Sequence, residues 1–275
     1  MNTALMRTMV GLALGVSLLA GAAVGQDRLV RLPDHRRIHL NCTGAGKVTV
    51  ILEAGFGADN EAWYKVQPKL SQTMRVCSYD RAGAGTSDPG PYPRDGKAIA
   101  NDLDQALRAA NIQGPYIGVG HSSGGLYMRL FAAKRASAMK GMVLVDPSVE
   151  HAIGWEGIRD RALICLRFAE KPPTDKADPL WKRCDSTNVA KWKTQVSEIE
   201  TLFTSTSDQV DAKARKTGAV RTIILSADQS GMAGAHAQMA RRFQHAEQRI
   251  IPSGHMMFFD QPEAIIAAVN DLAKR

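Results

Sequence analysis

The sequence predicts an α/β fold in which a doubly wound, mostly parallel sheet is covered by helices on both faces. Three observations support this prediction: short β-branched runs alternate with helical patterns, several of these runs are apolar almost throughout, and one long stretch without a clear strand interrupts the alternation. Strands are continuously apolar where both faces of a sheet are covered, because neither face meets water. The chain has 275 residues, of which 44% are hydrophobic and 23% charged, which is enough apolar material for one large domain.

The N-terminal segment has the pattern of a signal peptide. Arg7 supplies a positive charge, an apolar run covers 9–20, and small residues follow through Gly25. A membrane span needs roughly 20 apolar residues, more than this run contains. We therefore expect a signal peptide over 1–25, cleaved near Gly25, with an uncleaved anchor as the alternative. The domain over 26–275 is then exported, either periplasmic or secreted, and has no stable membrane span after cleavage.

Four cysteines lie in the predicted mature chain, an even number in a protein expected to leave the cytoplasm. They allow three connectivities. Cys42 and Cys77 fall within one predicted structural region, and Cys165 and Cys184 fall within another. We therefore expect disulfides with this pairing, and four buried free thiols are the alternative.

Six runs rich in β-branched residues predict the strands of the sheet. They cover 47–53, 74–79, 116–120, 140–145, 220–226 and 248–251. Between them, apolar residues recur at three- or four-residue spacing over 97–110, which predicts an amphipathic helix. Further helices are expected directly after Gly124, over 233–245 and over 262–273. This alternation of strands and helices predicts a mostly parallel sheet.

No clear strand pattern is found from about 148 to 217, a stretch that contains three tryptophans and two cysteines. We interpret it as a helical lid inserted between two core strands. Its apolar residues line an acyl pocket or form the lid's own small core, and the sequence leaves both readings open. They are Trp155, Leu163, Leu166, Phe168, Trp181 and Trp192.

The segment Gly-His-Ser-Ser-Gly-Gly over 120–125 follows a predicted buried strand and precedes a predicted helix. It matches G-x-S-x-G centred on Ser122, in which glycines two residues before and after the serine let neighbouring segments approach a sharp turn. The following helix directs its N-terminal N–H groups toward this serine. Ser122 is therefore the predicted nucleophile.

A serine hydroxyl needs a base whose pKa lies near the working pH, and that base needs an orienting acceptor. His255 follows the last predicted strand, where a doubly wound sheet presents its carboxyl-end loops to a ligand, so we predict it as the base. Asp228 lies just past the strand before the last and keeps the order Ser, acid, His, which makes it the predicted acid. Asp146 and Glu150, after the preceding strand, are the alternatives, with a structural role as a further reading of Asp146.

Three further motifs accompany the serine motif in the chain. Glu-Ala-Gly-Phe-Gly covers 53–57, Tyr-Asp-Arg-Ala-Gly-Ala-Gly-Thr-Ser covers 79–87, and Ser-Gly-His at 253–255 leads to Asp-Gln-Pro at 260–262. In this order the motifs resemble those of the α/β-hydrolase superfamily, and closely its lid-bearing serine esterase and lipase-like branch with an export signal. The resemblance covers about 38–273.

The resemblance implies an oxyanion hole in which the backbone N–H groups of Phe56 and Ser123 hold the charge that develops on a carbonyl oxygen. Many relatives carry a histidine where this chain has Ala54, so the hydrogen bonding inside that loop is expected to differ. In the family the turn with Asp80 and Arg81 packs near this loop, and the two residues are expected to form a structural pair.

Together these residues predict a serine hydrolase, a carboxylesterase that cleaves moderately hydrophobic small-molecule esters through an acyl-serine intermediate. The same triad is compatible with thioesterase, amidase, imino-peptidase or C–C hydrolase chemistry, and a catalytically inactive exported binding protein is the alternative of another class. No cofactor or metal is implied. The net charge of +8 comes from dispersed Lys and Arg without a basic run or zinc-finger spacing, so no nucleic-acid partner is expected.

Overall fold

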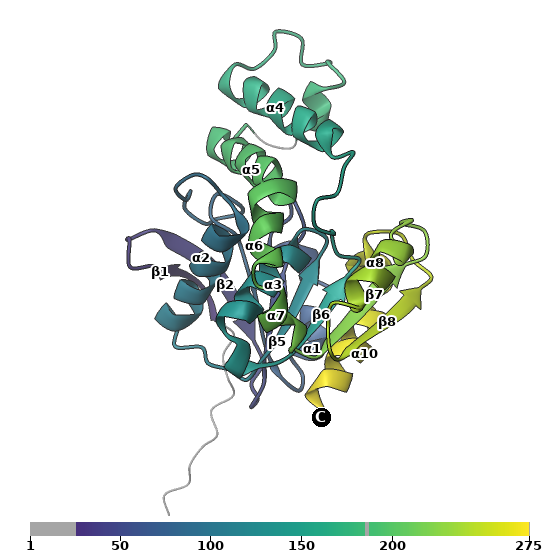
Figure 1. Ribbon diagram of the computed structural model, residues 1–275. Coiled ribbons are helices and arrows are strands. Elements are labelled where there is room, and N and C mark those ends of the chain that lie inside the picture. Colours follow the sequence, from purple (N-terminus) through teal and green to yellow (C-terminus); the bar gives the residue numbers. More distant parts are fainter. Residues whose placement is uncertain (1–25, 185–186, 275) are drawn as a thin grey trace, which may run out of the picture.

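The computed structural model describes residues 26–184 and 187–274, so the predicted signal peptide over 1–25 lies outside the described residues. Within these ranges the strands form one sheet with the order β1-β2-β4-β3-β5-β6-β7-β8 (Figure 1). The strands are β1 (Gln26–Arg31), β2 (Arg37–Thr43), β3 (Thr49–Glu53), β4 (Arg75–Tyr79), β5 (Tyr116–His121), β6 (Met139–Val145), β7 (Thr222–Ala227) and β8 (Ala246–Ile251). All six predicted strands are confirmed.

The first two strands were not predicted. β1 pairs antiparallel with β2, and β2 pairs antiparallel with β4, whereas the remaining neighbours are parallel. In β2 buried and more accessible residues alternate, while every residue of β3, β5 and β7 is buried. A search for continuously apolar runs therefore finds the central strands and passes over this antiparallel edge.

Helices cover both faces of the sheet, as predicted. Ile51 and Ile224 pack into one apolar cluster with residues of α2 (Gly96–Ala109) and α3 (Gly124–Lys134). Their neighbours Val50 and Leu225 point the other way and pack into a second cluster with residues of α1 (Gln67–Leu70) and α10 (Pro262–Ala273). Because β3, β5, β6, β7 and β8 run parallel, their carboxyl ends lie at one edge of the sheet, where the loops that follow them meet.

Most helix boundaries agree with the sequence prediction, and one does not. α2 begins after Asp95, whose side chain accepts a hydrogen bond from the N–H of Ala98 at 2.8 Å, and this cap fixes its start. α8 (Ala233–Ala240) is shorter than the predicted 233–245. The chain turns after it, and the N–H of Gln244 donates to the carbonyl of Gly218 at 2.8 Å, which leads into β8.

The stretch between β6 and β7 is helical, and its described residues contain no strand. It holds α4 (Glu156–Glu170), η3 (Trp181–Arg183), α5 (Val189–Thr201), η4 (Leu202–Thr206), α6 (Ser207–Asp211) and α7 (Ala214–Gly218). Three short helices lie outside the insertion: η1 (Asn60–Trp63), η2 (Ala136–Ala138) and α9 (Met257–Asp260). Figure 1 shows α4 farthest from the sheet and α5 between α4 and the sheet. Trp192 of α5 is buried against Ala162 and Cys165 of α4, which gives the insertion a small core of its own.

Both predicted disulfides are present. Cys42 in β2 is bonded to Cys77 in β4, its direct partner in the antiparallel register, with the Cα atoms 4.1 Å apart. Cys165 in α4 is bonded to Cys184, which follows η3, and holds that segment against the helix. No free cysteine occurs in the described chain.

The double substitution Cys42→Ala/Cys77→Ala is expected to lower the free energy of unfolding by about 4 kcal/mol. The disulfide closes a loop of 35 residues in the unfolded chain, and the entropy of that closure accounts for most of the expected loss. Urea denaturation of the oxidised wild-type and variant proteins measures the difference. An unchanged midpoint and slope would contradict the expectation.

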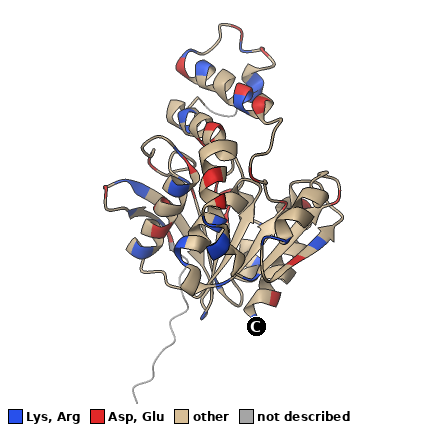
Figure 2. Cartoon of the chain, viewed as in Figure 1, with Lys and Arg blue, Asp and Glu red and all other residues tan. Residues whose placement is uncertain are grey.

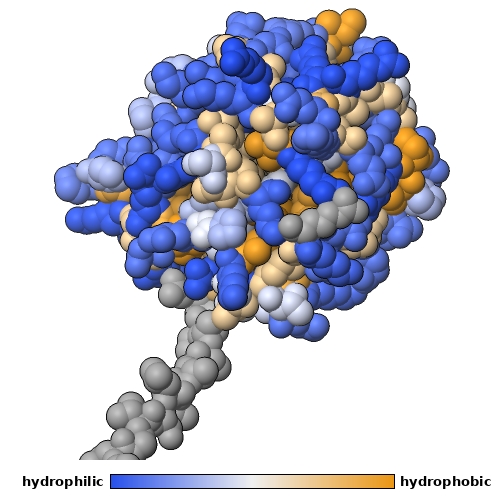
Figure 3. Space-filling model, turned by 60° about the horizontal axis from the view of Figure 1, so that its bottom comes forward, coloured by the Kyte–Doolittle hydropathy of each residue, from blue (hydrophilic) through white to orange (hydrophobic). Residues whose placement is uncertain are grey.

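Charged residues of both signs are interspersed over the helices and the outer strands, whereas β5 and β7 contain none (Figure 2). On the face in Figure 3, hydrophilic residues cover most of the visible surface, with smaller apolar areas between them. In 26–184 and 187–274, no helix is both long and apolar enough to cross a membrane.

Candidate active site

Ser122 occupies the sharp turn between β5 and α3. Its φ angle is +52°, in the left-handed region that non-glycine residues seldom adopt. A β-carbon at Gly120 would lie 2.5 Å from the carbonyl oxygen of Gly124, and one at Gly124 would lie 2.6 Å from that of Ala54. The turn is therefore closely packed against the loop after β3, and only glycine fits at these two positions.

The His255 ring is bonded to a buried carboxylate. Its Nδ1 lies 2.6 Å from Oδ2 of Asp146, whose side chain is fully buried, while the His255 side chain is 45% exposed. The other Asp146 oxygen accepts hydrogen bonds from the N–H of Ala227 at 3.0 Å and from the hydroxyl of Ser230 at 2.9 Å. Burial alone would raise the pKa of Asp146, but the hydrogen bonds from His255, Ala227 and Ser230 lower it below its ordinary value. An ionised Asp146 is an acceptor only, so it fixes the proton of His255 on Nδ1 and leaves Nε2 free to accept one.

The structure does not bring Asp228, the predicted acid, to His255. Asp228 is exposed, and its Oδ1 accepts a hydrogen bond from the N–H of Ser253 at 3.0 Å. The N–H of Asp146 donates to the carbonyl of Leu225 at 2.7 Å, so Asp146 sits directly at the buried end of the sheet. β7 continues past that level and carries Asp228 to the surface.

The second alternative acid, Glu150, is bound to arginines. Its carboxylate lies 2.5 Å from Arg129 and 3.0 Å from Arg242, and its side chain is 4% exposed. These ion pairs join the start of the insertion to α3 and to the segment after α8. Glu150 therefore has a structural position, and Asp146 is the carboxylate that the structure brings to His255.

The backbone N–H groups of Phe56 and Ser123 donate to no described residue. The loop that contains Phe56 is held by Arg81, whose guanidinium donates to the carbonyls of Ala54 and Gly55, each at 2.8 Å. Arg81 thus fixes the backbone of this loop through two of its carbonyl groups. Both N–H groups remain available to an anion beside Ser122.

Arg81 is the centre of a buried ionic cluster. Its guanidinium lies 2.8 Å from Glu53 in β3 and 3.1 Å from Glu198 in α5, and all three side chains are at most 3% exposed. The hydroxyl of Tyr79 donates to Glu53. The cluster joins the loop after β3 to the insertion, and no sequence pattern indicated Glu198 as the partner of Arg81.

The expected structural pair of Asp80 with Arg81 is wrong. Asp80 instead lies 2.9 Å from Nδ1 of His39 and accepts a hydrogen bond from the side chain of Asn60 at 2.7 Å. Successive residues after β4 point in opposite directions, so Asp80 faces the antiparallel edge and Arg81 faces the loop after β3.

Glu53 makes stability depend on pH. Burial raises the pKa of Glu53 to about 7, against the opposing attraction of Arg81. Because the folded state binds this proton more tightly than the unfolded state, the contribution is complete below pH 4.5 and is lost as the pH rises to about 7. The free energy of unfolding should fall by on the order of 3 kcal/mol across this window, and Glu53→Gln should remove that fall. Urea denaturation at several pH values tests this, and parallel pH profiles of the two proteins would contradict it.

His121, within the serine motif, supports the His255 loop. Its Nε2 lies 2.9 Å from the carbonyl oxygen of His255, and burial, aided by repulsion from His255, lowers the pKa of His121 to about 4. A neutral ring then donates its Nε2 proton to that carbonyl. The His121 ring also packs edge-on against Phe258 with centroids 4.8 Å apart, so it fixes the loop without a charge of its own.

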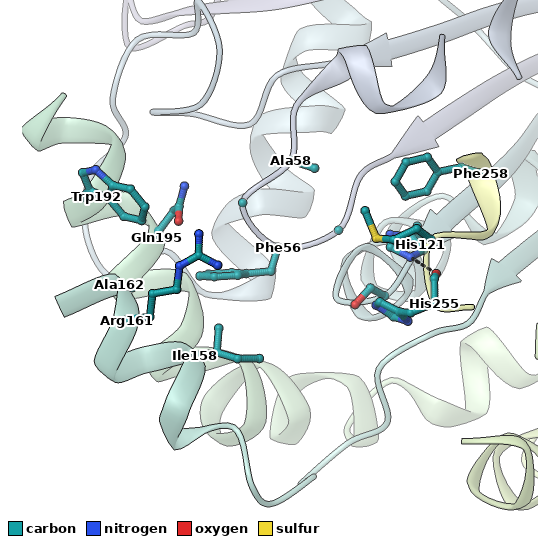
Figure 4. Close-up of a pocket in the computed structure, with 14 residues that line it drawn as sticks. Phe56, Ala58, His121, Ile158, Arg161, Ala162, Trp192, Gln195, His255 and Phe258 are labelled. Atoms are coloured by element: carbon teal, nitrogen blue, oxygen red, sulfur yellow. Dashed lines mark hydrogen bonds between the residues drawn. The ribbon is translucent and has the colours of Figure 1, made fainter. Parts of the chain in front are cut away.

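Ser122 and His255 open into one cavity of about 470 Å³. One wall is formed by the loop after β3 and by the His255 loop, and the other by α4 and α5, as Figure 4 shows. The lining residues are Gly55, Phe56, Gly57, Ala58, His121, Ser122, Ile158, Arg161, Ala162, Trp192, Gln195, His255, Met256 and Phe258. The sequence left open whether six apolar residues of the insertion line a pocket or form the core of the lid. Of these six, Trp192 does both, since it lines the cavity and belongs to the small core. Nowhere in the described ranges do three His, Cys, Asp or Glu side chains gather as a metal site would require.

Known structures share this fold. An esterase from Thermogutta terrifontis superposes with a TM-score of 0.73 at 20% identity, covering 90% of this chain and 98% of its own. An enol-lactonase from Burkholderia xenovorans LB400 gives a TM-score of 0.72 at 18% identity, covering 90% and 100%. At these identities the similarity shows the fold alone.

Relatives at higher identity match only in part. YqjL of Bacillus subtilis (strain 168) is 34% identical over 106 residues, which are 38% of this chain and 42% of YqjL. C23C11.06c of Schizosaccharomyces pombe is 33% identical over 155 residues, 46% of this chain and 29% of that protein. This chain thus spans less than half the length of these relatives.

The sequence model of one family covers most of the chain. It matches residues 50–268, a range that begins in β3, includes Ser122, Asp146 and His255, and ends in α10. The chain belongs to the alpha/beta hydrolase family.

Proposed function

We propose that the protein is a serine hydrolase that cleaves carboxylic esters, with Ser122 as nucleophile, His255 as base and Asp146 as the acid that orients it. The observation that carries the proposal is the 2.6 Å bond from His255 Nδ1 to the buried Asp146, in a cavity that Ser122 also lines. The strained turn at Ser122 supports it, and so do the N–H groups of Phe56 and Ser123, which donate to no described residue.

In the first half of the proposed reaction, Oγ of Ser122 attacks the ester carbonyl carbon while Nε2 of His255 takes the hydroxyl proton. The carbonyl oxygen becomes an oxyanion, which the N–H groups of Phe56 and Ser123 hold. Collapse of this intermediate breaks the bond to the alcohol oxygen, which leaves with the proton from His255. Asp146 stays ionised and stabilises the imidazolium between these two transfers.

In the second half, a water molecule gives one proton to His255 and attacks the acyl-serine carbonyl. The second tetrahedral intermediate collapses, the acid leaves, and His255 returns the proton to Ser122. The net reaction consumes one ester and one water and releases one acid and one alcohol. A cavity of about 470 Å³, lined mostly by apolar residues, suits a small, moderately hydrophobic substrate.

Export belongs to the same proposal. The two disulfides support an oxidising compartment, because cytosolic thiols are kept reduced. An exported enzyme with a cavity of this size would act on small esters outside the cytoplasm.

A fluorophosphonate, which phosphonylates activated serines, tests the proposal directly. The mature protein is labelled, the modified peptide is located by mass spectrometry, and turnover of dimethyl glutarate and p-nitrophenyl esters of increasing chain length is followed in parallel. An adduct on Ser122 together with ester turnover is expected. A folded sample with neither adduct nor turnover would overturn the proposal in favour of a binding protein.

A further inference from the structure

Two polar side chains from the insertion reach the cavity on the side away from His255. Figure 4 shows Arg161 of α4 and Gln195 of α5 close to each other beside the ring of Phe56. Of the described residues that line the cavity, only Arg161 belongs to the four charged types Lys, Arg, Asp and Glu. His121 is held neutral by burial, which lowers its pKa to about 4. The cavity therefore carries a fixed positive charge away from its catalytic end.

The Gln195 amide faces the cavity without a hydrogen-bond partner among the described residues. Gln195 is 9% exposed. A β-carbon at Gly57 would lie 3.6 Å from Oε1 of Gln195, so the amide stands beside the loop that holds the proposed oxyanion donors. Because Gln195 lines the cavity, its amide donor and acceptor are available to a polar group bound there.

The Arg161 guanidinium is oriented but not neutralised. Its Nη2 donates to the carbonyl of Arg183 at 2.9 Å, and no carboxylate of the described chain lies within ion-pairing distance. The disulfide from Cys165 to Cys184 ties the segment with Arg183 to α4, one turn from Arg161. The remaining guanidinium N–H groups are thus held in place for an acceptor.

We propose that Arg161 and Gln195 bind a carboxylate at the non-reacting end of the substrate, so that the enzyme is selective for small esters that carry a free acid group. This inference rests on the proposed ester hydrolysis at Ser122. A planar carboxylate matches the arginine fork and one amide N–H, and its single negative charge matches the single positive charge of the wall. Phe56, Ile158 and Ala162 supply apolar contacts for a few methylene groups between the two ends.

Two pairs of esters test the selectivity. Monomethyl glutarate carries the free acid on the acyl side and 4-acetoxybutyrate carries it on the alcohol side, and their neutral partners are dimethyl glutarate and methyl 4-acetoxybutyrate. Acid release is followed at low ionic strength, because Arg161 is exposed and salt screens its charge. The wild-type protein is expected to favour the acid over its neutral partner by at least about 10-fold in kcat/KM in one of the two pairs.

The variants assign that preference to these residues. Arg161→Gln should reduce the ratio of kcat/KM for the acid to that for its neutral partner by about 10- to 100-fold, the loss expected for a charge-assisted hydrogen bond. Arg161→Lys should keep part of the preference. Gln195→Glu should abolish it, because the new carboxylate would pair with Arg161 and neutralise the charge of this wall. The matched control is Arg167→Gln, which removes the same charge from an exposed position of α4 outside the cavity wall.

The outcomes separate this inference from the proposed function. Equal turnover of both members of each pair, or a preference that survives Arg161→Gln, would overturn the carboxylate site and leave ester hydrolysis standing. If no ester is turned over and Ser122 is not labelled, the proposed function fails. Calorimetry then compares the binding of monomethyl glutarate to Ser122→Ala and to the Ser122→Ala/Arg161→Gln double variant. The carboxylate site requires tighter binding to the single variant, and equal affinities would overturn it.

Discussion

Asp146→Asn should lower kcat for ester hydrolysis by about 10⁴-fold. The amide nitrogen of asparagine would donate to Nδ1 of His255, so the ring would carry its proton on Nε2 and could no longer accept one from Ser122. The amide oxygen can still accept from Ala227 and Ser230, which bond to Asp146 in the wild-type protein. Steady-state turnover of dimethyl glutarate measures the loss, and thermal unfolding checks that the variant is folded.

The matched control is Asp228→Asn. Asparagine keeps an oxygen that accepts from the N–H of Ser253, the contact that Asp228 makes, so its turnover should stay within about threefold of the wild-type value. If Asp228→Asn were the damaging change and Asp146→Asn the harmless one, the acid would belong to β7 and the proposed triad would be wrong.

Ser122→Ala should lower kcat by on the order of 10⁵- to 10⁶-fold and abolish fluorophosphonate labelling. The substitution keeps a β-carbon at the turn with φ of +52°, so the backbone conformation that Ser122 adopts remains equally accessible. What is lost is the oxygen that forms the acyl-enzyme. Single-turnover kinetics and intact-mass analysis measure both effects.

Ser123→Ala controls for the neighbouring hydroxyl. Ser123 is buried, and its proposed contribution is its backbone N–H, which alanine retains. Turnover within about tenfold of the wild-type value is expected. Comparable losses in both variants would show that the motif tolerates no change for structural reasons, and the nucleophile would then have to be identified by labelling alone.

The sequence predicted the sheet best where burial is complete. β3, β5 and β7 are buried along their whole length, so their apolar runs stand out, whereas buried and more accessible residues alternate along β2 of the antiparallel edge. The turn at Ser122 was predictable because its glycines are required by close approaches within a few residues and to the neighbouring loop. Local sequence carries such requirements directly.

Contacts between residues far apart in the sequence were harder to predict. Asp146 and Asp228 each follow a neighbouring parallel strand and both precede His255, so chain order could not separate them. The decision depends on how far β7 runs past β6, a property of the assembled sheet. The partnership of Arg81 with Glu198 likewise joins positions 117 residues apart and depends on the path of the insertion.

The contacts of α5 fasten the insertion to the body of the protein. The C-terminal half of this helix makes these contacts, since Glu198 pairs with buried Arg81, and Ser197 and Thr201 bond to the backbone of Arg94. Separating the Arg81 pair would cost about 3–5 kcal/mol, because it leaves buried charges uncompensated. Ala162 and Cys165 of α4 pack against Trp192 of α5, so the fastening of α5 determines where the helix that carries Arg161 stands relative to the catalytic loops.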